Sequence, residues 1–144
     1  MYSGYLPVAG TTRNLHYMYL ESRSNPVKDP VVIWFNGGPG CSSMLGFMQE
    51  HGPYVMEDGT NFFHENPWSW NKEVNMLYIE MPAGVGYSYY NEVGDHDYTD
   101  MGVAKDNLSA LLYFFEFKFP ELKGNDLYIS GESYAGIYVP YLAW

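Results

Sequence analysis

One serine, Ser133, stands in a setting that suits a catalytic nucleophile. It follows an apolar strand expected at 127–130, and the small residues Gly131 and Ala135 flank it at −2 and +2. A strand that ends in a tight turn around a serine, with a helix starting at once, is the layout of a nucleophile elbow. The usual pattern has glycine at +2, whereas here the glycine is at +3, Gly136. The expected chemistry is attack by the serine hydroxyl on a carbonyl carbon.

The partners of such a serine are expected outside these residues. In folds with a nucleophile elbow, the catalytic acid and the histidine follow the serine in chain order. Only eleven residues follow Ser133, and none of them is Asp, Glu or His. The chain is therefore expected to hold the attacking half of a catalytic site without its base.

A serine nucleophile also needs two backbone N–H groups aimed at the oxygen that becomes negative. One is expected from Tyr134, the residue after Ser133, at the start of a helix. The other is expected from the glycine-rich loop 36–40, which follows the apolar run 31–35. Glycine lets a backbone approach a ligand closely, so this loop and the elbow together predict an oxyanion hole.

The apolar runs at 31–35 and 75–80 are typical of strands buried on both faces. Further strands are expected at 1–9, 15–22 and 127–130, and a short helix at 42–50. A long helix, capped by Thr99 or Asp100 and ended by Phe119-Pro120, is expected to bury the face formed by Ala104, Leu108, Leu111 and Phe115. This order of elements predicts an α/β fold with a mostly parallel sheet, in one domain.

Composition narrows the class of protein. The chain has 144 residues, 47% of them hydrophobic and 19% aromatic, which is enough for one domain with a sizeable core. The aromatic excess indicates either core packing or a cleft lined with rings. The net charge of −10 argues against nucleic acid as a partner, and no apolar stretch is long enough to span a bilayer. Such acidity also suits a protein that works at low pH.

Neither a metal nor another cofactor is predicted. There is one cysteine, Cys41, and the histidines are scattered without metal-ligand spacing at His16, His51, His64 and His96. The odd cysteine is either a buried thiol or has its partner outside this chain. No secretory signal precedes Tyr2, and Asn107 begins a glycosylation sequon that would matter only in a secreted protein.

Four motifs, in order, resemble those of the serine carboxypeptidases. They are the segments 34–43 (WFNGGPGCSS), 66–71 (NPWSWN), 82–88 (PAGVGYS) and 131–136 (GESYAG). The stretch 3–6 (SGYL) also resembles the start of the mature family domain, so the resemblance covers nearly the whole chain. It implies an α/β-hydrolase that removes one C-terminal amino acid from peptides at acidic pH, in lysosomes, vacuoles or secretions.

The resemblance also implies roles for single residues. Ser133 corresponds to the nucleophile, and Gly38 and Tyr134 correspond to the oxyanion donors. The terminal carboxylate of the substrate would be held by Asn36, Glu50 and Glu132, with Trp34 nearby. Two glutamates beside a substrate carboxylate cannot all be charged at low cost, so a shared proton and an acidic optimum are expected. Cys41 would form a disulfide whose partner is absent here.

These expectations describe residues 1–144 as the N-terminal part of a single α/β-hydrolase domain whose later strands, acid and histidine are missing. The expected partners are peptides or proteins with a free C-terminus and the missing part of the same domain. Two alternatives stay open. A related acyltransferase would use the same serine to pass an acyl group to an alcohol, and a truncated paralogue or incorrect reading frame would give an inactive chain.

Overall fold

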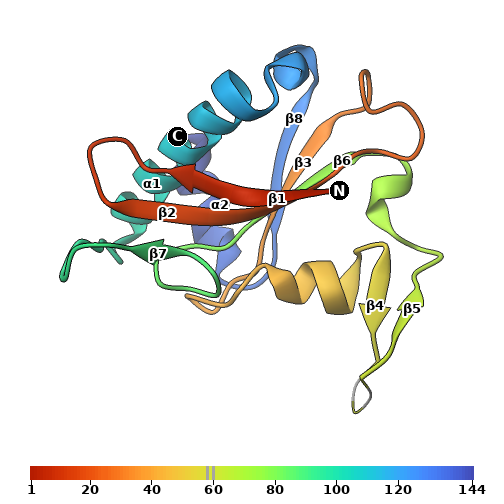
Figure 1. The fold of residues 1–144 in the computed structure, drawn as a ribbon, viewed down its shortest axis with the longest axis horizontal. Helices are drawn as coiled ribbons and strands as arrows, with labels where there is room; N and C mark the ends of the chain where they lie inside the picture. The colour runs from red at the N-terminus through yellow and green to blue at the C-terminus, as the bar shows by residue number, and fades with distance from the viewer. Residues whose placement is uncertain (58, 60) are drawn as a thin grey trace.

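The computed structural model describes residues 1–57, 59 and 61–144. Its main sheet consists of β1 (Tyr2–Pro7), β2 (Arg13–Leu20), β3 (Val31–Phe35), β6 (Asn75–Ile79), β7 (Tyr89–Tyr90) and β8 (Leu127–Gly131). The strand order is β1-β2-β6-β3-β8, and β7 pairs with β2 (Figure 1). β3 runs parallel to both of its neighbours, whereas β2 pairs antiparallel with β1, β6 and β7. The predicted α/β class is confirmed, and the sheet is mixed rather than mostly parallel.

The alternation of side chains along the central strands builds two cores. Ile33 and Phe35 of β3 pack with Leu77 of β6 on one face of the sheet. Trp34 lies between them in sequence and packs with Tyr78 in a second cluster. Successive side chains of a strand point to opposite faces, so these runs must be apolar throughout to fill both cores. The predicted double-sided burial of both strands is thereby confirmed.

Both α-helices pack in the first core. They are α1 (Asp100–Tyr113), which contacts β1, and α2 (Ala135–Ala143), which contacts β8 and α1 (Figure 1). The Thr99 hydroxyl oxygen accepts a hydrogen bond from Gly102 N at 3.1 Å and caps α1, as the sequence predicted. The helical backbone continues through Phe114–Lys118 and ends before Pro120.

The buried face of α1 agrees in part with the prediction, because Ala104 and Leu111 are buried and Phe115 packs against the core. Leu108 is 50% exposed, while Asp106 and Asn107 are buried beside Val103. Asp106 lies against Arg13, and Asn107 Nδ2 donates to the Val103 carbonyl at 2.9 Å. The predicted burial of Leu108 was wrong because Asp106 and Asn107, which have partners in the interior, share the buried face instead.

Between β3 and β6, the described residues of the segment 36–74 lie outside the main sheet. A helical segment, Gly46–Glu50, falls within the predicted 42–50 and leads to a two-stranded sheet of β4 (Tyr54–Met56) and β5 (Phe63–Glu65), which lies apart from the main sheet (Figure 1). A short 3-10 turn at Trp70–Lys72 precedes β6. Among the helices of the described residues, none has the length and apolar character to cross a membrane.

Candidate active site

The turn between β8 and α2 has the geometry of an elbow. Ser133 has a φ of 55°, in the left-handed region that non-glycine residues rarely adopt. A Cβ added to Gly131 would lie 2.5 Å from both Ala135 Cβ and the Phe35 carbonyl oxygen. Small residues at 131 and 135 are therefore required for the strand to turn into the helix at this point. The strained backbone leaves Ser133 exposed at the end of the sheet.

The loop after β3 lies directly against this elbow. A Cβ added to Gly37 would lie 2.5 Å from Tyr134 N and 2.7 Å from the Glu132 carbonyl oxygen. Only glycine allows this approach of one backbone to another. The next residue, Gly38, has a φ of 108°, which again favours glycine. The two backbone segments predicted to form an oxyanion hole, at Gly38 and Tyr134, are thus brought together.

Asn36 forms hydrogen bonds to the other three side chains that the resemblance assigns to carboxylate binding, which are Trp34, Glu50 and Glu132. Its Oδ1 accepts hydrogen bonds from Trp34 Nε1 at 2.9 Å and from Gly46 N at 3.0 Å. These two donors fix the orientation of the amide, so Nδ2 points to the acids. Nδ2 donates to Glu50 Oε1 at 3.0 Å and to Glu132 Oε1 at 3.2 Å. Two carboxyl groups therefore share one neutral amide beside Ser133.

Sequence reasoning missed His51, which follows Glu50 directly. Its ring is buried against Trp34 and Trp70, with ring centroids 4.3 Å away in both contacts. Its Nδ1 lies 2.9 Å from the Tyr78 hydroxyl oxygen, and burial lowers its pKa to about 4. The one available signal was its place between an acidic residue and Gly-Pro, which is a weak one.

A second missed group holds the neighbouring loops in place. Glu80 is 1% exposed and accepts hydrogen bonds from Ser42 Oγ and from Tyr87 N, the latter at 2.9 Å. Its Oε2 lies 3.0 Å from His16 Nδ1. Burial alone would raise the pKa of Glu80, but hydrogen bonds from His16, Ser42 and Tyr87 lower it overall. This buried carboxylate fastens the loop at 82–88 to the residues next to Cys41.

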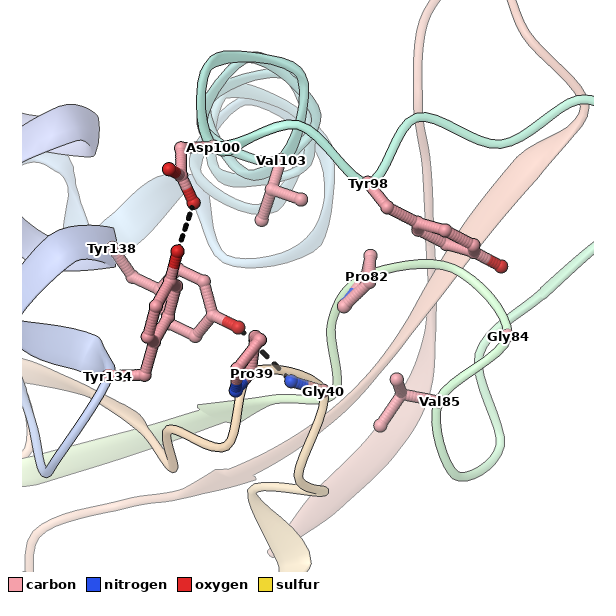
Figure 2. A pocket seen from close by; sticks show the side chains of 10 residues that line it. All are labelled: Pro39, Gly40, Pro82, Gly84, Val85, Tyr98, Asp100, Val103, Tyr134 and Tyr138. Carbon is pink, nitrogen blue, oxygen red and sulfur yellow. Dashed lines mark hydrogen bonds between the residues drawn. The ribbon is translucent and has the colours of Figure 1, made fainter.

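A cavity of about 300 Å³ adjoins the elbow between the loops and the start of α1 (Figure 2). On its wall, the Tyr134 hydroxyl donates to Asp100 Oδ1 at 3.0 Å, and Gly40 N donates to the Tyr138 hydroxyl oxygen at 3.1 Å (Figure 2). The first bond fixes the Tyr134 side chain to α1, and the second fixes the glycine loop to α2.

Comparison with known proteins decides the family. A family model described as serine carboxypeptidase matches residues 1–144. The chain belongs to the serine carboxypeptidase family. It is 49% identical to serine carboxypeptidase-like 20 of Arabidopsis thaliana and 49% identical to the lysosomal protective protein of Mus musculus, each over 99% of its length. It covers 30% and 29% of those two proteins, so it spans under a third of their length.

Solved structures support the same family and fold. A crystal structure of Kex1(Δ)p, a prohormone-processing carboxypeptidase from Saccharomyces cerevisiae, superposes with a TM-score of 0.83 at 31% identity, over 98% of this chain and 32% of that one. Est1E from Butyrivibrio proteoclasticus shares the fold alone, with a TM-score of 0.62 at 21% identity, over 97% of this chain and 46% of that one. The fold is therefore the α/β-hydrolase fold of serine carboxypeptidases, in part.

Three of the four histidines of this serine carboxypeptidase chain contact other side chains away from Ser133. His16 bonds Ser3 and Glu80, and His51 lies against Tyr78. His96 stacks on Tyr98, and His64 lies in β5. In the part of the chain that the structure describes, no group of three or more His, Cys, Asp or Glu residues could hold a metal ion.

The structure also places the two residues that were predicted to be modified, the disulfide candidate Cys41 and the glycosylation candidate Asn107. Cys41 is an exposed free thiol, and its disulfide stays a prediction. The glycosylation expectation at Asn107 conflicts with the structure, because this side chain is 3% exposed and bonded within α1. A glycan needs an accessible amide nitrogen on the surface, and this nitrogen is already donating to Val103 O.

Proposed function

We propose that the protein acts as a serine-type carboxypeptidase, which releases C-terminal amino acids from peptides through an acyl-enzyme on Ser133. The supporting observation is the amide of Asn36, which donates to both Glu50 and Glu132 next to the elbow. A neutral donor between two acids is poorly suited to structural stabilisation, because it leaves their charge uncompensated. It suits a site that takes up a proton together with a further carboxylate.

Recognition would depend on that proton. A carboxyl of the pair that carried a proton would donate a hydrogen bond to the terminal carboxylate of the peptide. Without that proton, three negative groups would face one another and binding would weaken. The site would therefore favour peptides with a free C-terminus and an acidic working range.

The chemistry would proceed at the neighbouring residue. Ser133 Oγ forms a bond to the carbonyl carbon, and its proton passes to a histidine supplied from outside these 144 residues. The N–H groups of Gly38 and Tyr134 stabilise the negative oxygen of the intermediate. The C–N bond then breaks, and the histidine returns the proton to the leaving amine. Water hydrolyses the remaining ester and restores Ser133.

Residues 1–144 would then be the N-terminal part of one α/β-hydrolase domain. The remainder would supply the Asp, the His and a partner for Cys41. An acidic compartment, such as a lysosome or vacuole, or the outside of the cell would suit both the proton requirement and the disulfide. The name of the mouse relative, lysosomal protective protein, agrees with such a location.

The test uses a polypeptide that carries these residues together with the acid and the histidine, called the complete polypeptide below. We expect it to release the terminal amino acid from a blocked dipeptide at pH 5, and Ser133→Ala to reduce the rate by several orders of magnitude. The 144-residue chain alone should show negligible turnover. Activity that survives Ser133→Ala would refute the proposal, and transfer to an added alcohol in preference to water would indicate an acyltransferase instead.

A further inference from the structure

The ring of His51 is held rigidly beside the carboxylate cluster. It is 6% exposed, stacks on Trp70 with an interplanar angle of 18°, and meets the edge-on ring of Trp34. Its backbone is also fixed, because Trp70 N donates to the His51 carbonyl at 3.1 Å. A side chain confined in this way presents its two nitrogens in constant directions.

Those two nitrogens are in unequal situations. Nδ1 lies 2.9 Å from the Tyr78 hydroxyl oxygen, whereas Nε2 is buried and has no hydrogen-bond partner among the residues that the structure describes. The nearest acid to Nε2 is Glu50, whose Oε2 lies 3.8 Å away. A buried polar atom without a partner is costly, and catalytic hydrogen bonds are often long until the ligand binds. A small rotation of the half-exposed Glu50 side chain would close this gap.

The position of the ring proton follows from the neighbours. If Nδ1 carried the proton, the lone pair of Nε2 would face the Glu50 carboxylate and repel it. If the Tyr78 hydroxyl donates to Nδ1, Nε2–H faces Oε2 and attracts it. The groups that face the ring from other elements are Tyr78, Trp34 and Trp70, and burial raises the pKa of the Tyr78 phenol, so it stays protonated. The Nε2–H tautomer is therefore the favoured one.

The ring also stays neutral where the site would work. Burial lowers the pKa of His51 to about 4, so a solution at pH 5 leaves most of the rings uncharged. An N–H donor that stays neutral at the working pH can hold a neighbouring carboxyl without changing the charge of the site. A fully exposed histidine would become positive in the same range.

We propose that His51 is a positioning residue of the carboxylate site, whose Nε2–H holds Glu50 Oε2 so that Oε1 stays on Asn36. This inference rests on the proposed function and adds a residue to it. Glu50 then receives an N–H at each of its oxygens, from Asn36 and from His51, and its carboxyl group is held in one orientation beside Ser133.

The test compares two His51 variants in the complete polypeptide, on a blocked dipeptide acid and on the same dipeptide amide. We expect His51→Leu to raise KM for the acid about tenfold, the usual loss for one hydrogen bond to a charged group. Values of kcat, and both constants for the amide, should stay within about twofold. His51→Gln retains an N–H donor and should recover most of the loss. His64→Leu, in the exposed strand β5, is the matched control.

A second variant checks the tautomer. Tyr78→Phe removes the hydroxyl that donates to Nδ1, and we expect the same selective rise in KM for the acid, by about threefold or more. Equal losses on acid and amide, or His51→Gln as poor as His51→Leu, would indicate a merely structural ring and overturn the inference. Unchanged acid selectivity in His51→Leu would also overturn it. Loss of the proposed function itself would show separately, as turnover that survives Ser133→Ala.

Discussion

Two places in this molecule bring a pair of carboxyl groups to one nitrogen-bearing side chain. In the first, Asn36 donates to Glu50 and Glu132. In the second, Arg13 Nη1 lies 3.0 Å from Asp106 Oδ2, and Arg13 Nε lies 3.5 Å from Asp95 Oδ1. The first central group is neutral and the second is a cation, so Arg13 offsets negative charge on its pair of acids and Asn36 does not.

The two clusters also differ in access. The carboxyl of Asp106 is buried, and although Nη1 of Arg13 is close, the geometry of the contact is not that of a hydrogen bond. Burial raises its pKa to about 6 despite Arg13. Glu50 and Glu132 instead have exposed surface beside Ser133. A pair of acids therefore indicates a ligand site when the group between them is uncharged and the acids are exposed to solvent, as Asn36, Glu50 and Glu132 are arranged here.

The largest expected effect breaks the first cluster. In the complete polypeptide, Asn36→Leu removes the donor that Glu50 and Glu132 share near the substrate carboxylate. We expect kcat/KM for a dipeptide acid to fall about a thousandfold, in the range found when one partner of a hydrogen-bonded charged group is removed. Hydrolysis of the matching amide should fall far less. Equal losses on both substrates would show that Asn36 only supports the fold.

The next effect breaks the second cluster. Arg13→Met leaves Asp95 and Asp106 without a cation, and we expect the free energy of unfolding at pH 7 to fall by about 3 kcal/mol. The kinetic constants of the folded protein should not change. Arg23→Met is the matched control, because its ion pair with Glu65 is exposed and should contribute almost nothing. A similar loss in both variants would contradict the distinction between the sites.

The pH dependence of stability should separate the clusters further. The folded pKa of Asp106 is raised above its ordinary 3.8, so the folded state binds this proton more tightly and stability falls as pH rises from about 4 to about 6. The folded pKa of His51 is lowered from 6.5 to about 4, so its contribution is lost as pH falls through that range.

Denaturant melts across this window should resolve the two contributions. Asp106→Asn should reduce the loss of unfolding free energy that accompanies a rise toward neutral pH, by on the order of 2 kcal/mol. His51→Leu should reduce the loss of unfolding free energy that accompanies acidification, by a similar amount. The two variants should therefore change the slope of stability against pH in opposite directions, and parallel curves would refute both assignments.

The smallest expected effect compares the two glutamates. Glu132→Gln mimics a protonated carboxyl, so activity on peptide acids should extend to higher pH, with a change of about threefold at pH 7. In Glu50→Gln, the new side-chain NH2 group faces an N–H donor, either Asn36 Nδ2 or His51 Nε2, which cannot accept a hydrogen bond from it. Substrate binding should therefore weaken at every pH. Identical pH profiles for wild type and both variants would exclude a shared proton.

Much of this architecture followed from the sequence. The strands at 31–35, 75–80 and 127–130, the cap at Thr99 and the turn around Ser133 were predicted because their signals are local: apolar runs, small residues and a capping hydroxyl. The spatial meeting of Asn36, Glu50 and Glu132 followed from the resemblance alone, since 96 residues separate the first from the last.

The errors have a common physical cause. The predicted burial of Leu108 on α1 was wrong because the buried face includes Asp106, whose partner Arg13 lies far away in sequence. His51 was missed because its partner Tyr78 is 27 residues distant, and Glu80 because His16 is 64 residues distant. A polar side chain in the interior depends on a partner that periodicity does not reveal.

The backbone between Glu132 and Ser133 has a consequence for substrate length. If Glu132 holds the terminal carboxylate and Ser133 attacks the carbonyl, a single peptide bond sets the separation between recognition and cleavage. Gly37 packs against the elbow so closely that this separation cannot stretch. A peptide would therefore lose one residue at a time, and a substrate bound one residue further along would have its scissile carbonyl out of reach of the serine.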